Sequence, residues 1–329
     1  MHLEHLNYLV CPTCKANLII AETEQQSQTI IETGSLKCIA CAETYPIIRH
    51  IPRFVPLENY ASGFGLEWTK HARTQYDSYS GANISETRLF NETRWARQLA
   101  GQVILELGSG SGRFTEHLIS TGAMVISTDL SYAVEANYSS NGSKANVLIV
   151  QSNIYKMPFR ENFFDKILCI GVLQHTPDVK QSFMRLPPYL KSGGSLVIDV
   201  YRRQHGLREW LRPRNWARAL TQNLEPEKLY RWCERYVTLM WPLTRSLHKI
   251  PGGRQIIWAL LIADYTGFYN LSQQMLREWA ILDTFDILAP AYDQPQHLET
   301  VQAWFEESNL GNIEVHYGYN GIEGRGTKL

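Results

Sequence analysis

The amino-acid sequence predicts an α/β fold, with helices on both faces of a mostly parallel sheet and a small cysteine-rich module in front of it. Apolar runs suited to buried strands alternate with helical patterns between Gly101 and Tyr201, which is typical of strands joined by crossover helices. A glycine-rich turn follows the first of these strands, Val103–Leu107. Two Cys-x-x-Cys pairs near the amino end predict the separate module.

Length and composition limit the class of protein. The chain has 329 residues, of which 44% are hydrophobic and 19% charged, as in ordinary globular proteins of about two domains. The formal net charge is zero, so the whole chain has no general attraction to nucleic acid or anionic membranes. No secretory signal pattern is visible, and the longest apolar stretch, Ile256–Ala263, is too short to cross a bilayer. We therefore expect a cytoplasmic protein without an integral membrane segment.

The four paired thiols predict a structural zinc site. Zinc prefers four soft ligands in a tetrahedron, and each Cys-x-x-Cys turn can supply two of them. In a reducing compartment this spacing favours a metal over a disulfide, and a module of this size rarely holds a core without a cross-link. Two short strands, Ile19–Ala21 and Thr29–Glu32, are expected between the pairs. The expected zinc ligands are Cys11, Cys14, Cys38 and Cys41.

The sequence after the second cysteine pair carries a family resemblance. It contains the segments Tyr45–Ile47 and Ile51–Phe54, and together with the cysteines it resembles the Trm112-type zinc ribbon. His50 stands where that pattern usually has glycine. The resemblance implies a zinc ribbon over residues 1–56. Trm112-like proteins are separate subunits that support a methyltransferase, whereas here the ribbon is followed by further sequence in the same chain.

Residues 57–100 are expected to form a linker with helices. Apolar residues recur at helical spacing from Ser85 to Ala100, which predicts a helix with Ser85 as its N-cap. Phe64 and Trp68 lie four residues apart. Two hypotheses stay open for this aromatic pair, because it can either cover a ligand or simply pack between the parts of the chain.

The turn from Gly108 to Gly112 has the composition of a ligand-binding loop. Glycines let the backbone approach a ligand at the carboxyl end of a strand, and the helix that begins near Phe114 offers free N–H groups. A second strand, Met124–Thr128, ends at Asp129, whose carboxylate can accept hydrogen bonds from both hydroxyls of a ribose. The turn and the acid together indicate a nucleoside-containing ligand.

Glu106 narrows the choice of ligand. An acid beside a phosphate site is unfavourable, whereas an acid near a cationic ligand is favourable. The segment Leu105–Phe114 resembles the first motif of class I S-adenosylmethionine-dependent methyltransferases, and the resemblance continues from Gly101 to Tyr201. It implies a Rossmann-like sheet and S-adenosyl-L-methionine as the cofactor, with Asp129 on the ribose and Asn153 near the adenine. The implied cofactor residues are Glu106, Gly108, Ser109, Gly110, Gly112, Asp129, Leu130, Asn153 and Ile154.

His175 is the candidate catalytic base. It follows the fourth predicted strand, whose carboxyl end faces the cofactor site, and histidine titrates near neutral pH. Methyl transfer needs mainly positioning, together with removal of a proton when the acceptor is a hydroxyl or an amine. The alternative is that His175 only lines the adenine pocket. Gln174 beside it is a candidate for orienting the substrate.

An insert of residues 201–296 follows the fifth predicted strand and is expected to form a helical cap. From Tyr201 to Arg254 it holds twelve Lys and Arg against four Asp and Glu, and it is rich in Trp. Three partners suit this composition: an acidic small-molecule substrate, an anionic membrane surface, or RNA bound by basic and stacking side chains. A solvated basic face on an ordinary cap is the fourth hypothesis. Caps often close substrate pockets, which favours a substrate role.

The end of the insert brings several polar residues together. The segment from Asp283 to Asp293 resembles that of a branch of bacterial methyltransferases with an amino-terminal zinc ribbon, associated with surface polysaccharide or specialised-metabolite pathways. Asp283 and Asp286 can also cap the ends of secondary-structure elements. A final helix and strands are expected over residues 297–329. The candidate substrate residues are Gln174, Asp283, Asp286, Tyr292 and Arg325.

Three functions are compatible with this pattern. The first is a methyltransferase acting on a hydroxyl or amine of a sugar or specialised metabolite. The second is an RNA methyltransferase that grips RNA with the ribbon and the basic insert, although the ribbon itself is not basic. The third is a non-enzymatic partner of another methyltransferase, against which the intact cofactor motif argues. The sequence leaves the oligomeric state open. The expected parts are a ribbon (1–56), a linker (57–100), a cofactor-binding core (101–200), a cap (201–296) and the end of the core (297–329).

Overall fold

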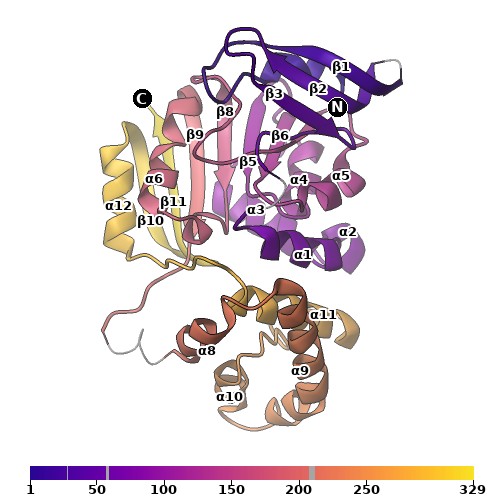
Figure 1. Cartoon of the computed structure of the whole chain (residues 1–329). Coiled ribbons are helices and arrows are strands. Elements are labelled where there is room, and N and C mark those ends of the chain that lie inside the picture. The colour runs from indigo at the N-terminus through magenta and orange to yellow at the C-terminus, as the bar shows by residue number, and fades with distance from the viewer. Residues whose placement is uncertain (28, 57–58, 207–211) are drawn as a thin grey trace.

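The computed structural model describes residues 1–27, 29–56, 59–206 and 212–329. It shows a small antiparallel sheet, a larger central sheet and a layer of helices, arranged one above another (Figure 1). The predicted fold class is confirmed, including helices on both faces of the central sheet and a helical insert after its fifth strand. Residues 57–58 of the predicted linker and 207–211 of the predicted cap lie outside the described residues.

The central sheet has seven strands in the order β10-β11-β9-β8-β5-β6-β7. Strands β5 to β9 pair in parallel, whereas β11 pairs antiparallel with both β9 and β10. Strands such as β5 and β7 are apolar runs buried along nearly their whole length, as expected where helices cover both faces. The strands are β5 (Val103–Leu107), β6 (Met124–Asp129), β7 (Val147–Gln151), β8 (Phe164–Cys169), β9 (Leu190–Val200), β10 (Leu310–Gly318) and β11 (Gly321–Lys328).

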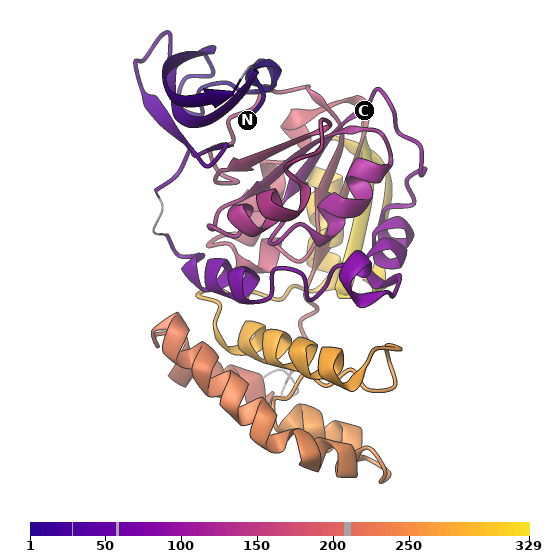
Figure 2. The ribbon, with the colours of Figure 1, turned by 90° about the vertical axis from the view of Figure 1, so that its right-hand side faces the viewer.

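Helices cover the two faces of this sheet (Figure 2). Leu89, Leu118 and Val134 bring α3, α4 and α5 into one apolar cluster with the strands. Phe183 and Phe305 bring α6 and α12 into a second cluster on the opposite face. The helices are α3 (Ile84–Thr93), α4 (Arg113–Ser120), α5 (Val134–Asn141), α6 (Val179–Met184) and α12 (Leu298–Glu307).

Helix α3 differs from the expected helix at both ends. Ser85 is not its N-cap; its hydroxyl donates to the carbonyl of Gln75 instead. The carboxylate of Asp77, in the short helix α2 (Asp77–Ser80), accepts hydrogen bonds of 2.7–3.0 Å from three successive N–H groups at the start of α3. The helix ends before Ala100 because Arg94 adopts the left-handed conformation, with φ of 54°.

The amino-terminal sheet is built from longer strands than the sequence predicts. The first of these strands was expected to end at Ala21, yet pairing continues to Ser27, opposite Ile30. Backbone pairing tolerates polar side chains where both faces of a hairpin are exposed, as they are along the end of this strand. The strands are β1 (Leu18–Ser27), β2 (Ile30–Cys38), β3 (Thr44–Ile48) and β4 (Ile51–Pro52).

The ribbon and the central sheet share one hydrophobic core. Leu9 and Leu36 of the ribbon belong to the same buried cluster as Met157 and Phe159, which precede β8. Polar contacts reinforce the junction, since the Lys15 ammonium donates to the carbonyl of Met157 at 2.8 Å. The ribbon is therefore packed as an integral part of the fold.

The insert forms a helical cap with a core of its own. Leu229, Val237, Ile257 and Phe285 are among its buried residues. Helix α11 is the cap helix nearest the central sheet (Figure 2), and α1 contacts both α9 and α11. In the described part of the chain, none of the helices combines the length and apolar character that crossing a bilayer requires. The helices are α1 (Ser62–Lys70), α8 (Pro213–Thr221), α9 (Pro226–Leu247), α10 (Gly253–Ala259) and α11 (Gln273–Leu288).

We predict that Asp77→Ala lowers the free energy of unfolding by about 1–3 kcal/mol, because three N–H groups of α3 lose their acceptor. Urea unfolding measures this change. Glu161→Ala removes an exposed acid and serves as the control, with an expected change within about 0.5 kcal/mol. Equal unfolding midpoints for the two variants would contradict the capping role.

Candidate functional site

The glycine-rich turn after β5 has a backbone that only glycine adopts without strain. Gly108 and Gly112 have φ of 67° and 95°, in the left-handed region. A Cβ on Gly108 would lie 2.1 Å from the Val172 side chain, and one on Gly112 would lie 2.2 Å from the Asn137 side chain. The first glycine thus lets β5 pass close to the segment after β8, and the last lets α4 approach α5.

Asp129 joins the end of β6 to this turn. Its Oδ2 accepts a 2.9 Å hydrogen bond from the N–H of Gly110, and its Oδ1 accepts bonds from the N–H and hydroxyl of Ser131. Because β5 and β6 are parallel neighbours, the turn and the acid meet at the same edge of the sheet. The sequence predicted this meeting from the order of the two strands.

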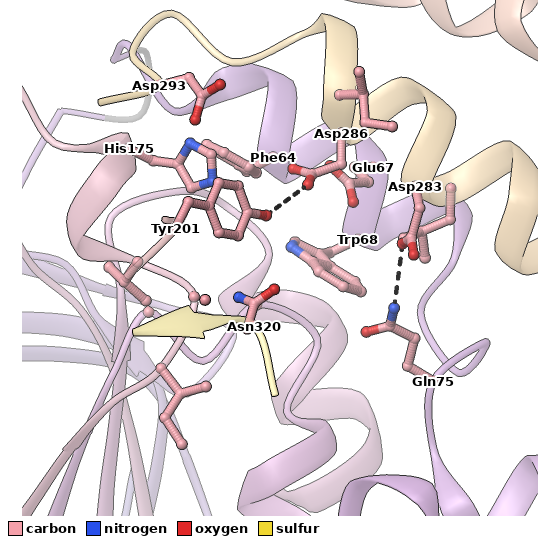
Figure 3. A pocket seen from close by; sticks show the side chains of 18 of the residues that line it. Phe64, Glu67, Trp68, Gln75, His175, Tyr201, Asp283, Asp286, Asp293 and Asn320 are labelled. Carbon is pink, nitrogen blue, oxygen red and sulfur yellow. Dashed lines mark hydrogen bonds between the residues drawn. The ribbon is translucent and has the colours of Figure 1, made fainter. Parts of the chain in front are cut away.

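A cavity of about 1050 Å³ lies between this edge of the sheet and the cap (Figure 3). One end is lined by the turn and Asp129, and the other by residues of α1, α10 and α11. Phe64 and Trp68 both line it, and the Trp68 indole lies against the backbone of Gly110. The aromatic pair thus forms part of the cavity wall, as the first of its two hypotheses required.

Six of the nine implied cofactor residues line this cavity, and three do not. The Asn153 side chain accepts a hydrogen bond from the N–H of Tyr155 within its own turn, and Gly112 faces Asn137. Glu106 lies beneath the turn. The residues that line the cavity are Gly108, Ser109, Gly110, Asp129, Leu130 and Ile154.

Glu106 is held inside the sheet and is only 2% exposed. Its Oε2 accepts hydrogen bonds from the hydroxyls of Thr115 and Ser127 at 2.5 and 2.8 Å, whereas its Oε1 has no partner. Burial raises the pKa of this carboxyl to about 7, although the two hydroxyls oppose the shift. The group connects α4 to β5 and β6 from below the turn.

His175 lines the cavity just beyond β8 (Figure 3). Its Nδ1 lies 2.9 Å from the carbonyl oxygen of Tyr292. A carbonyl only accepts, so Nδ1 carries the proton and Nε2 is the acceptor nitrogen of the neutral ring. The rings of Phe64 and Tyr201 pack around the imidazole, with centroids 5.0 and 5.4 Å away.

The candidate substrate residues are divided between the cavity and its surroundings. Asp283 and Asp286 line the cavity from α11, where they lie inside the helix and do not cap its ends. Gln174 is fully buried, and Tyr292 contributes its backbone carbonyl to His175. The prediction for Arg325 is wrong, because this residue lies outside the cavity lining. Its guanidinium donates to the carbonyl of Glu92 and to the Glu314 carboxylate on β10.

The sequence reasoning missed many residues of the cavity lining, among them two polar side chains next to Asp286. Glu67 projects from α1, and Tyr201 follows β9 and donates a hydrogen bond to Asp286 (Figure 3). The signal for Glu67 was its place between Phe64 and Trp68 on a segment suspected of covering a ligand. Nothing in the local sequence marked Tyr201.

Three carboxylates face one another across the cap side of the cavity. Burial raises the pKa of Glu67 well above its usual range, and the charges of Asp286 and Asp283 raise it further. Burial also raises the pKa of Asp283 to about 7. The pKa of Asp286 is raised by burial and lowered in part by His175. This wall of the cavity is acidic, although the insert as a whole is basic.

The four paired cysteines meet at one point of the ribbon. Their sulfur atoms all lie within 4.8 Å of one another. Cys14 Sγ lies 3.4 Å from Cys38 Sγ and 3.5 Å from Cys41 Sγ, and Cys11 Sγ lies 3.6 Å from Cys41 Sγ. A tetrahedral zinc ion with bonds of about 2.3 Å needs sulfur atoms about 3.8 Å apart. The donor set therefore fits one zinc ion.

Comparison with known families identifies two domains. Residues 105–198 match the family described as a methyltransferase domain, and residues 2–49 match the family described as Trm112p-like protein. The chain thus contains a methyltransferase domain behind a Trm112p-like domain, and both predicted resemblances are confirmed.

Individual relatives are similar over part of their length. Phosphoethanolamine N-methyltransferase 2 of Caenorhabditis elegans is 27% identical over 157 residues, covering 43% of this chain and 35% of that protein. Demethylmenaquinone methyltransferase of Thermobifida fusca (strain YX) is 30% identical over 102 residues, covering 30% and 43%. The chain thus spans less than half of both curated relatives. A solved complex of the Haloferax volcanii Trm112 methyltransferase activator with a methyltransferase has a TM-score of 0.44 and 11% identity, covering 80% and 96%.

We predict that Glu106→Gln flattens part of the pH dependence of stability. The Glu106 pKa is about 7 in the folded chain and 4.5 in the reference state. Between these pH values the folded state binds the proton of Glu106 more tightly than the unfolded state does. The contribution of Glu106 to the free energy of unfolding is therefore largest below pH 4.5 and is lost as the pH rises to 7. The wild type should lose about 3 kcal/mol more than the variant over this window.

Urea unfolding across this pH range measures the difference. Groups that both chains share cancel in the comparison, and Glu161→Gln, at an exposed position, should give a profile parallel to that of the wild type. If the Glu106→Gln profile is also parallel, the carboxyl ionises in the folded protein as it does in the unfolded one.

Proposed function

We propose that this chain, which carries a methyltransferase domain behind a Trm112p-like domain, transfers a methyl group from S-adenosyl-L-methionine to a hydroxyl or amine of a small molecule. One observation carries the proposal. The cavity that begins at the glycine turn and Asp129 continues without interruption to His175 and the cap. Its volume of about 1050 Å³ is at the upper end of the range for small-molecule sites, which leaves room for a cofactor and an acceptor together.

The residues at the sheet edge suit the cofactor. When bound, S-adenosyl-L-methionine supplies a methyl group on a positively charged sulfur. Asp129 is available to accept from the ribose hydroxyls, and the turn at Gly108 lets the backbone lie close to the ligand. Leu130, Ile154 and Trp68 supply apolar wall around the same space. Glu106 supports the turn from below, and we propose this supporting role in place of direct contact.

His175 is proposed as the proton acceptor for the methyl-accepting group. The carbonyl of Tyr292 holds Nδ1–H, which leaves Nε2 as the acceptor nitrogen. Phe64 and Tyr201 pack against the ring and restrict its orientation. This arrangement of an oriented base in a cavity is what general base catalysis requires.

The four cysteines are proposed to bind one structural zinc ion. Four thiolates complete a tetrahedron and leave no open coordination position. The ribbon lies at the opposite end of the central sheet from the cap (Figures 1 and 2), so the metal is remote from the proposed chemistry. We also propose the division into residues 1–56, 57–100, 101–200, 201–296 and 297–329 as the functional parts of the chain.

RNA methylation remains a second candidate because one feature favours it. Trp232 on α9 is 52% exposed, and Arg231 and Arg235 are exposed beside it on the same helix. The ribbon and the cap, however, lie at opposite ends of the molecule (Figure 1), so the two cannot form a single continuous grip. Steep loss of heparin and RNA binding with rising salt would support this candidate.

We predict that Asp129→Ala weakens S-adenosylmethionine binding at least tenfold, because the ribose hydroxyls lose their acceptor. Calorimetric titration measures the affinity. His175→Ala should keep the affinity and slow methyl transfer by about 10²–10⁴-fold, measured as labelled methyl groups entering a small-molecule extract. Asp178→Ala, at the N-cap of α6 and outside the cavity lining, is the control. A wild-type chain that does not bind the cofactor would refute the proposal.

We predict that the purified chain contains one zinc ion per chain and that Cys14→Ser loses it. Loss of the metal should lower the free energy of unfolding by roughly several kcal/mol, because metal binding is coupled to folding of the ribbon. Metal analysis and thermal unfolding with a chelator measure both effects. Cys169→Ala, which removes a buried thiol of β8, should retain the zinc. Unchanged stability after complete zinc removal would exclude a structural role.

A further inference from the structure

We propose that the acceptor substrate carries an ammonium group and that Glu67, Asp283 and Asp286 bind this group in the cap side of the cavity. The inference rests on the proposed methyltransferase function and specifies the chemical class of its acceptor. It starts from three acids of α1 and α11 that line one cavity.

Glu67 is the observation that points to a ligand. Its side chain projects from α1 into the cavity beside Trp68 and Asp286 (Figure 3). It is only 1% exposed, and its buried Oε2 has no hydrogen-bond partner. A buried carboxylate without a partner destabilises the folded state. A ligand that donates a hydrogen bond to this oxygen explains why the group is present in the cavity.

The other two carboxylates are held in place by neutral donors. The Tyr265 hydroxyl donates to Asp283 Oδ2 at 2.5 Å, and the Gln75 amide lies 3.4 Å from Asp283 Oδ1. The Tyr201 hydroxyl donates to Asp286 at 3.2 Å. These contacts orient the two carboxyl groups and bring no positive charge to them.

Two of the nearby arginines are engaged in other ion pairs, whereas Arg113 lines the same cavity and acts on Asp283 through its charge. Arg218 pairs with Asp293, and Arg88 pairs with Glu92 and Asp199. Within the described ranges, no Lys, Arg or His forms an ion pair with Glu67, Asp283 or Asp286. Arg113, Arg88, Arg218 and His175 act on the two aspartates only at longer range.

The arrangement favours an organic cation over a metal ion. Among the residues that the structure describes, the groups with ligand atoms close enough for one metal are the four cysteines and a surface cluster of His205, His297 and Glu299; the three acids form no such group. The aromatic rings of Trp68 and Tyr201 line the same space. Aromatic faces add a cation–π attraction that suits an ammonium group.

This inference revises the expectation of an acidic substrate. That expectation came from the basic composition of the insert, but Lys228, Arg231, Arg235 and Lys249 lie on the exposed surface of the cap. Arginines of α8 and of the segment after β9 also line the cavity, whereas the wall formed by α1 and α11 is acidic. The basic composition of the insert therefore does not describe the wall formed by α1 and α11.

The test compares ethylammonium, which is charged, with ethanol, which has a similar size and no charge. Thermal unfolding of the full chain, saturated with S-adenosylhomocysteine, is followed with increasing ethylammonium chloride, with sodium chloride and ethanol as matched controls. The proposal expects a rise in Tm with ethylammonium beyond that with either control, because a ligand of the folded state stabilises it. Glu67→Gln and Asp286→Asn should each weaken this effect at least tenfold in ligand concentration.

Control variants keep the test independent of folding defects. Glu67→Gln preserves the shape of the side chain and removes a buried ionisable group, so without ligand its Tm should equal or exceed that of the wild type. Glu306→Gln on α12, at an exposed position, should change neither Tm nor the response to ethylammonium. A wild-type response no larger than that to sodium chloride, or a full response in Glu67→Gln, would overturn the proposal.

The same experiment distinguishes two sources of the cation, since the cofactor also carries an ammonium group. If the acids bind the acceptor, Glu67→Gln leaves the affinity for S-adenosylhomocysteine unchanged. If that affinity falls tenfold and ethylammonium competes with S-adenosylhomocysteine, the acids serve the cofactor and the acceptor assignment is wrong. A wild-type chain that does not bind S-adenosylhomocysteine refutes the proposed function, while the ethylammonium response of the free chain still tests the cation site.

Discussion

The parallel pairing of β5 with β6 and β8 is the constraint on which the rest of the site depends. Parallel strands end at the same edge of a sheet, so the turn at Gly108, the acid at Asp129 and the loop with His175 meet although they are far apart in the chain. The turn between β10 and β11 lies at the same edge and contributes Asn320 to the lining of the cavity. The cap and α1 pack over this edge and form the cavity with it.

The acidic residues at the two ends of the cavity differ in how well their carboxylates are hydrogen-bonded. At the sheet edge, Asp129 is satisfied by backbone and hydroxyl donors. On the cap side, Glu67, Asp283 and Asp286 are buried with neutral partners or none. Burial raises the pKa values of all three, and neighbouring acids raise those of Glu67 and Asp283 further. Such an arrangement weakens the folded state and is retained where a ligand compensates for it. The binding role that we propose for these acids rests on this arrangement.

The ribbon contributes to the molecule in a different way. Its buried side chains continue into the core of the central sheet, so the interface is packed like the interior of a domain. Its cysteine cluster lies at the far end of the sheet from the cap (Figure 1). The proposed zinc ion at that position would stabilise the ribbon and, through the shared core, the strands that carry the glycine turn and Asp129.

The sequence by itself determined the fold class, the ribbon and the sheet edge, because these depend on local patterns: glycine spacing, an acid at a strand end and paired cysteines. The same patterns located Asp129 and His175 at the cavity. Tertiary structure decided the rest. The sequence did not show that Arg325 and Glu106 have partners in other elements, which are Glu314 on β10 and the hydroxyls of α4 and β6. Glu67 and Tyr201 were missed because only packing of α1 and the cap against the sheet buries them in one cavity. Local sequence encodes an element and its ends, whereas the charge that faces a ligand depends on which elements pack together.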